Sequence, residues 1–168
     1  NDSRIRFKFL SNIDGDHFHD IVSDLDPSST LFVIASKSFT TQEAITNAQS
    51  ARNWIIEHFG SKKAVASHFI AASSNLEEVK KFGIAKENTL AMWDWVGGRY
   101  SWLSAVGLTL MIAIGPQDFA QVRAGARNMD EHFKTASLEE NAPVILGLIS
   151  FWYSFYGAQT EAIVPYSQ

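Results

Sequence analysis

Cysteine is absent from this chain of 168 residues, which excludes disulfides, thiolate metal sites and a cysteine nucleophile. Basic residues are not in excess either, since 14 Lys and Arg stand against 18 Asp and Glu. Binding to a nucleic-acid backbone needs clustered Lys and Arg, so we expect no nucleic-acid partner. The most apolar stretch, 102–114, is shorter than the ~20 residues that a membrane-spanning helix needs, so we expect no membrane partner.

What the chain does contain is enough apolar material for a packed core, because 46% of its residues are hydrophobic. The sequence begins with Asn1 rather than Met and carries no signal-peptide pattern. The lack of cysteine favours a protein of the reducing cytoplasm. Both ends look internal, so we expect a piece of a longer chain.

Four stretches have the length and pattern of strands, and we expect them near residues 5–10, 31–36, 67–72 and 89–93. The first alternates apolar and basic residues, which is typical of a half-buried strand. The others are continuous apolar runs, as in parallel strands that are covered on both faces. Helical patterns separate the later strands, and this alternation predicts an α/β fold with a mostly parallel sheet.

The last third of the chain predicts a helical segment. Residues 102–114 read as an apolar helix capped by Ser101, and 119–133 read as an amphipathic helix. A third helix is expected to begin at Asn141, with Leu148 and Trp152 among its inward-facing residues.

A run rich in hydroxyl groups joins the second strand to the following helix: Ser36, Lys37, Ser38, Phe39, Thr40 and Thr41. Ligands of open α/β sheets bind beyond the carboxyl ends of the strands. A helix N-terminus offers free N–H groups and partial positive charge to an anion. Lacking the glycines of a nucleotide P-loop, the run suits a compact monophosphate. The alternative is ordinary helix capping, with Thr40 and Glu43 as a capping box.

A second polar run, 94–101, lies between the last strand and the apolar helix. Its Gly97 and Gly98 allow the backbone to approach a ligand closely. Arg99 adds a permanent charge and a forked donor. A tight turn with a solvated arginine is the alternative. The five histidines show no ligand spacing, so a metal site is not expected.

The two runs resemble motifs of the phosphoglucose isomerase family, and the similarity continues through 125–133 and 160–166. The resemblance implies a sugar-isomerase (SIS-type) domain over 1–168, a three-layer α/β/α sandwich with a mostly parallel sheet followed by a helical segment. It also implies that this domain is partial. The family's first strand and Gly-Gly-Ser phosphate loop lie upstream, and its catalytic Glu segment lies downstream.

The resemblance further implies reversible isomerisation of glucose 6-phosphate to fructose 6-phosphate, in glycolysis and gluconeogenesis, through an enediolate. It implies no metal and no organic cofactor, and a homodimer. Ser36, Lys37, Ser38 and Thr41, with Thr40 nearby, would hold the substrate phosphate. Gly98 would belong to the substrate-binding loop. Arg99 would be catalytic and stabilise the enediolate.

The family's general base, ring-opening histidine and late lysine match no residue of this chain. Proton transfer at a sugar carbon needs a positioned base, so we expect this stretch to be inactive alone. Two other interpretations remain: a non-catalytic, regulatory module that binds sugar phosphates, and an oligomerisation scaffold. The scaffold would leave both polar runs unexplained.

Overall fold

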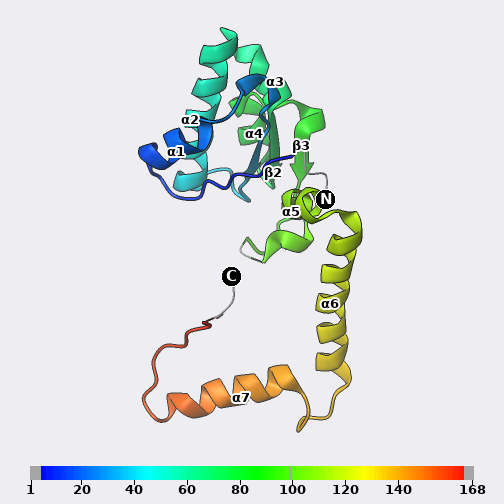
Figure 1. The fold of residues 1–168 in the computed structure, drawn as a ribbon. Helices are drawn as coiled ribbons and strands as arrows, with labels where there is room; N and C mark the ends of the chain where they lie inside the picture. Colours follow the sequence, from blue (N-terminus) through cyan, green and yellow to red (C-terminus); the bar gives the residue numbers. More distant parts are fainter. Residues whose placement is uncertain (1–4, 99, 165–168) are drawn as a thin grey trace. The chain divides into compact units, whose positions relative to one another are not determined.

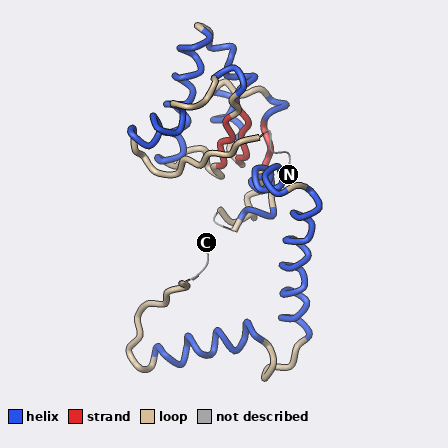
Figure 2. The backbone as a smooth tube through the Cα atoms, in the orientation of Figure 1, coloured by secondary structure: helices blue, strands red, loops and turns tan. Residues whose placement is uncertain are grey.

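The structure is a computed structural model that describes residues 5–98 and 100–164, in two compact units, Asn1–Phe119 and Ala120–Gln168. The first unit holds a parallel sheet in the order β1-β2-β3 (Figures 1 and 2). Its strands are β1 (Phe32–Ala35), β2 (Phe69–Ser73) and β3 (Thr89–Ala91). Phe32 pairs with Phe69, and Ala71 pairs with Thr89. The α/β class, the parallel sheet and three of the four expected strands are confirmed.

The strand expected at 5–10 is wrong, because these residues form no strand. An alternating pattern of apolar and polar residues does not show whether a neighbouring strand is there to pair with. Phe9, one of the apolar residues of this pattern, is 75% exposed. Arg6 and Lys8 instead reach Asp24, with N–O distances of 3.1 and 3.3 Å. The hydrogen bond from Lys8 and the two positive charges lower the pKa of the Asp24 carboxyl group.

The first unit also contains α-helices and shorter 3-10 helices, which are labelled η. They are α1 (Gly15–Val22), η1 (Pro27–Ser29), α2 (Gln42–Phe59), η2 (Lys62–Ala64), α3 (Val65–His68), α4 (Leu76–Phe82), η3 (Lys86–Asn88), η4 (Ser101–Leu103), η5 (Ala105–Gly107) and α5 (Leu108–Ile114). Asp14 caps α1 through its carboxylate, and Gly60 ends α2 with a φ of 62°, as a left-handed C-cap requires.

The core lies on both faces of β2. Phe69 and Ala71 belong to a cluster with residues of α2, α3 and α4. Ala72, one step along the strand, belongs to a smaller cluster that includes Met92 and Val96 and is packed by the η5 segment. Alternate residues of a strand point to opposite faces, so the sheet is covered on both sides at β2, as its apolar run predicted.

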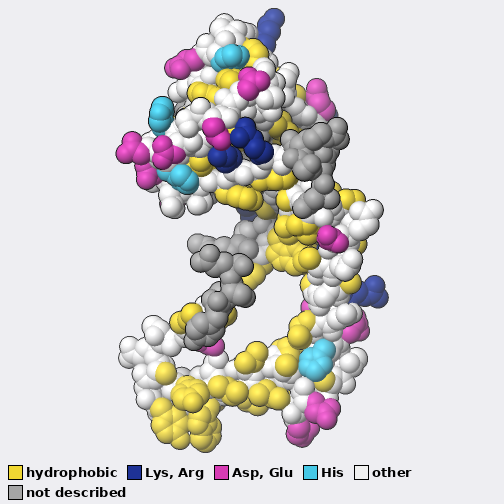
Figure 3. All heavy atoms as spheres, in the orientation of Figure 1, with side chains coloured by type: hydrophobic (Ala, Val, Ile, Leu, Met, Phe, Trp, Pro, Cys, Tyr) yellow, Lys and Arg dark blue, Asp and Glu magenta, His cyan; other side chains and the backbone are white. Residues whose placement is uncertain are grey.

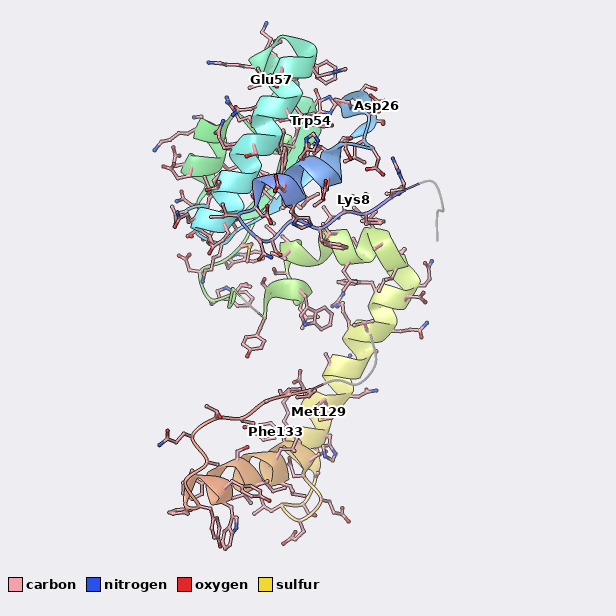
Figure 4. All side chains as sticks on the ribbon, turned by 60° about the vertical axis from the view of Figure 1, so that its left-hand side comes forward. Lys8, Asp26, Trp54, Glu57, Met129 and Phe133 are labelled. Atoms are coloured by element: carbon pink, nitrogen blue, oxygen red, sulfur yellow. The ribbon has the colours of Figure 1, made fainter. Side chains whose placement is uncertain are left out.

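Aromatic rings fill the larger cluster. Phe69 is fully buried and stacks on Phe32, with 5.1 Å between ring centroids. Trp54, which comes from α2 and is labelled in Figure 4, meets Phe32 edge-on at 6.0 Å. Phe82 meets Phe69 at 5.6 Å. The end of α4 is thereby packed against the middle of the sheet.

The single helix expected from Ser101 to Ile114 is interrupted. The chain instead forms η4, η5 and then α5, and Ser104 between the first two has extended backbone with ψ of −162°. The backbone of Gly107 lies so close to the carbonyl oxygen of Trp102 that a Cβ atom at this position would clash with it, so glycine permits this close approach. A regular helix would separate these two backbone groups.

The second unit contains most of α6 (Pro116–Thr135), which begins in the first unit, and α7 (Ala142–Ser154). Asn141 caps α7 and donates to the Phe133 carbonyl oxygen at 2.8 Å, which ties α7 to the end of α6. The expected inward placement of Leu148 and Trp152 is wrong, since their exposed fractions are 60% and 61%.

Hydrophobic side chains gather on the surface of α7 in Figure 3. Met129 and Phe133 on α6, labelled in Figure 4, are also exposed. The periodicity predicted both helices correctly but could not say what covers them. Within the described ranges, no helix is long and apolar enough to cross a membrane.

Candidate functional site

Three loops leave the sheet at the carboxyl ends of its strands: the hydroxyl loop (36–41) after β1, the serine loop (73–75) at the end of β2, and the tryptophan loop (93–98) after β3. The strands are parallel and in register, so all three loops share one edge. The Lys37 ammonium donates to the Asp94 carbonyl oxygen at 2.6 Å and joins the first loop to the third. Two of these loops are the polar runs that the sequence places between a strand and a helix.

Ser36 begins the hydroxyl loop just beyond β1. Its N–H donates to the Ala72 carbonyl oxygen at 3.1 Å, which continues the ladder. The residue is only 5% exposed, and its hydroxyl oxygen has no hydrogen-bond partner among the described residues. Leaving a buried hydroxyl unpaired costs about 1–3 kcal/mol, so this group is a natural contact for a bound polar ligand.

Thr41 precedes α2 as its N-cap residue, but its hydroxyl makes no capping hydrogen bond. Thr40 instead donates its hydroxyl hydrogen to the Ser38 oxygen at 2.8 Å. The capping box expected from Thr40 and Glu43 is therefore wrong. Without side-chain capping, the first N–H groups of α2 face the loop, as in helix N-termini that bind anions.

Phe39 gives the hydroxyl loop its shape. It is the one non-glycine residue in the described ranges with positive φ, at 53°, and it is 5% exposed. Its ring meets Phe82 edge-on with 5.8 Å between centroids. The Phe39 N–H donates to the Ser36 carbonyl oxygen and the Thr40 N–H to the Ser38 hydroxyl oxygen, each at 3.3 Å, so the loop's own hydrogen bonds close the turn. Nothing in the sequence signals this conformation, because phenylalanine rarely adopts it.

The serine loop donates hydrogen bonds to the backbone carbonyl groups of the hydroxyl loop. The carbonyl oxygen of Lys37 accepts from the Ser73 hydroxyl at 2.8 Å, and from the Ser74 hydroxyl and N–H at 2.8 and 2.9 Å. Asn75 donates its amide to the Ser38 carbonyl oxygen at 3.0 Å. Sequence analysis missed these residues, although they repeat the hydroxyl loop's pattern of polar residues between a strand and a helix.

The tryptophan loop presents two exposed rings and the paired glycines. Trp93 and Trp95 stack with 5.9 Å between centroids. Gly98 is held in its turn by the buried Ser101, whose hydroxyl donates to the Gly98 carbonyl oxygen at 2.6 Å. Ser101 thus fixes the turn rather than capping a helix. Arg99, which was predicted to be catalytic, lies outside the described residues.

An apolar hollow of about 210 Å³ also exists in the first unit, lined by residues that include Leu90, Met111 and Phe119. None of the three loops contributes to it. The hollow is therefore separate from the three loops at the sheet edge. No group of three His, Asp or Glu residues in the described ranges is close enough together to hold a metal ion.

The fold and this edge place the chain among α/β proteins whose ligand loops follow the strands of a parallel sheet. A family model described as phosphoglucose isomerase matches residues 1–168. The chain therefore belongs to the phosphoglucose isomerase family.

Curated relatives agree with this family. The chain is 56% identical over 168 residues to glucose-6-phosphate isomerase 1 of Streptomyces avermitilis, covering 99% of this chain and 31% of that protein. It is 53% identical to the glucose-6-phosphate isomerase of Paraburkholderia xenovorans, covering 95% of this chain and 30% of that protein. The chain thus spans about a third of the length of these relatives.

Solved structures show the same fold. A glucose-6-phosphate isomerase from Chlamydia trachomatis has a TM-score of 0.70 and 32% identity, covering 86% of this chain and 27% of its own. A hypothetical protein from Thermus thermophilus has a TM-score of 0.73 and 28% identity, covering 91% of this chain and 36% of its own.

Proposed function

We propose that this chain is the sugar-phosphate-binding part of an isomerase that interconverts glucose 6-phosphate and fructose 6-phosphate. The observation that carries the proposal is the joining of the family's two motif loops at one sheet edge by the Lys37–Asp94 hydrogen bond. The curated relatives, which match 99% and 95% of this chain, are named for this activity.

In this proposal the hydroxyl loop holds the phosphate. Ser36 supplies a buried hydroxyl without a competing partner, Lys37 a positive charge, and Thr41 a hydroxyl next to the start of α2. Ser38 and Thr40 add a hydrogen-bonded pair of hydroxyls. Each charge-assisted hydrogen bond to the phosphate would contribute about 1.5–3 kcal/mol.

The chemistry would occur at the sugar end of the substrate. As a proton moves between C1 and C2, an enediolate oxygen gains negative charge, and the Arg99 guanidinium would stabilise it. Gly98 would let the backbone approach the sugar closely. The base that moves the proton has no counterpart in this chain. We further propose a cytoplasmic homodimer for the full-length protein.

Replacing Ser36 and Thr41 together with alanine should weaken sugar-phosphate binding at least about tenfold, because two charge-assisted hydrogen bonds are lost. The measurement is calorimetric titration of fructose 6-phosphate into a full-length isomerase that carries this segment. Ser50→Ala is a matched control, since its hydroxyl only donates to the Thr46 carbonyl oxygen within α2. Unchanged affinity in the double variant would refute the phosphate site.

The 168-residue chain, assayed alone, should show no isomerisation above background, because no general base matches the family's. The assay should follow fructose 6-phosphate formation after the chain has been purified from a host that lacks its own isomerase. Turnover that persists in such a preparation would contradict the assignment of the base to another part of the enzyme.

A further inference from the structure

Asn75 of the serine loop makes two side-chain hydrogen bonds that serve different parts of the structure. The Asn75 side-chain oxygen accepts from the Glu78 N–H at 3.3 Å and caps α4. Its side-chain amide donates to the Ser38 carbonyl oxygen at 3.0 Å. The first contact is local to α4, whereas the second crosses to the hydroxyl loop, 37 residues earlier in the sequence.

The contact with Ser38 falls where the loop is under most conformational strain. Phe39, the next residue, is held at a φ of 53°. For a residue other than glycine this conformation costs of the order of 1–3 kcal/mol, and it persists only when the surroundings determine it. Two contacts hold this turn: the Phe39 ring packs edge-on against Phe82, and the Asn75 amide donates to the carbonyl oxygen of the preceding peptide.

The contact also affects charge. A carbonyl oxygen carries partial negative charge and would repel an anion if it were left without a donor nearby. The Lys37 carbonyl oxygen is occupied by donors from Ser73 and Ser74, and the Ser38 carbonyl oxygen by Asn75. With both oxygens paired to donors, they repel an anion at the loop less, and the uncapped N–H groups at the start of α2 remain for it.

We infer that Asn75 is a positioning residue for phosphate binding, acting through the Ser38 peptide and the Phe39 turn. This inference rests on the proposed function, because it assigns a role within the same phosphate site. Asn75 holds the loop in its anion-binding shape before the substrate arrives, and such preorganisation increases affinity.

The test uses a substitution that separates the two duties. Serine caps helices about as well as asparagine but has no amide group to donate to the Ser38 carbonyl oxygen. Asn75→Ser in the full-length isomerase should raise KM for glucose 6-phosphate and Ki for inorganic phosphate roughly five- to tenfold, as for one lost hydrogen bond. We expect kcat within about twofold and Tm close to that of the unsubstituted enzyme, because the cap is retained. Asn75→Ala should weaken phosphate binding equally but also lower Tm.

Asn141 provides a matched control. It too caps a helix, α7, and donates to a carbonyl oxygen, that of Phe133, but its contact does not involve the hydroxyl loop. Asn141→Ser should therefore leave KM and Ki unchanged. If Asn75→Ser does not fold, Asn75→Thr offers the same separation and the same expected result.

The outcomes separate this inference from the proposed function. If Ser36→Ala with Thr41→Ala weakens phosphate binding while Asn75→Ser binds like the unsubstituted enzyme, the role of Asn75 is overturned and the phosphate site stands. If neither variant changes Ki for phosphate, the phosphate site itself is wrong. A fall in kcat and Tm with KM unchanged in Asn75→Ser would make Asn75 purely structural and would also overturn the inference.

Discussion

Replacing Arg99 with alanine in a full-length isomerase that carries this segment is expected to lower kcat by ~10²–10³, the usual effect of removing one donor to a developing oxyanion. KM should change far less, because the enediolate charge exists mainly in the transition state and an interaction made only there leaves ground-state binding unaltered. The measurement is steady-state kinetics in both directions of the reaction.

Arg99→Lys provides the matched control for charge. A lysine keeps the positive charge but not the planar fork, so we expect it to recover little of the lost rate. Full activity in Arg99→Lys would show that charge alone is sufficient. A rise in KM with kcat unchanged in Arg99→Ala would move Arg99 from catalysis to substrate binding.

The second large effect is expected in the core of the first unit. Phe69→Ala removes a fully buried ring that stacks on Phe32 at 5.1 Å and meets Phe82 at 5.6 Å. Such a truncation costs about 3–5 kcal/mol, because it removes buried apolar area and leaves a cavity. Amide hydrogen exchange of β1 and β2 peptides should accelerate by more than about a hundredfold where exchange requires this core to open.

The control is Phe69→Leu, which keeps most of the volume and should cost less than about 1.5 kcal/mol. The same peptides, followed by mass spectrometry, should then exchange only modestly faster. Equal increases in exchange rate for the two substitutions would contradict the prediction, because they would mean that the core closes around alanine and leaves no cavity. Phosphate affinity should fall in Phe69→Ala as well, because Phe82 packs against both Phe69 and Phe39.

The sheet could be predicted from the sequence because its strands are short apolar runs that are buried on both faces. The same approach was wrong at 5–10, where an alternating pattern has no neighbouring strand to pair with. It was also wrong at 102–114, where the close approach of Gly107 to the Trp102 carbonyl group divides the apolar segment. Both errors have the same cause: the structure of each segment depends on contacts that the spacing of its apolar residues does not show.

The positions of two polar loops of the candidate site could be predicted from the sequence. The hydroxyl run and the glycine pair were visible because they lie between a strand and a helix. The supporting residues were not, because Asn75 reads as an ordinary helix cap and Phe39 as an ordinary apolar residue. Only the folded chain shows that the amide of Asn75 reaches Ser38 and that Phe39 adopts a left-handed conformation.

The hydrogen bonds that hold the hydroxyl loop have a consequence for folding. They join residues 36, 37 and 57 positions apart in the sequence. Closing such long loops costs chain entropy before any contact is gained, so contacts of this kind form late. We therefore expect the loop to take its shape only after both parallel crossovers are complete. Phosphate added during refolding should then leave the early folding steps unaffected and stabilise the native state alone, by an amount that grows with its concentration relative to Kd.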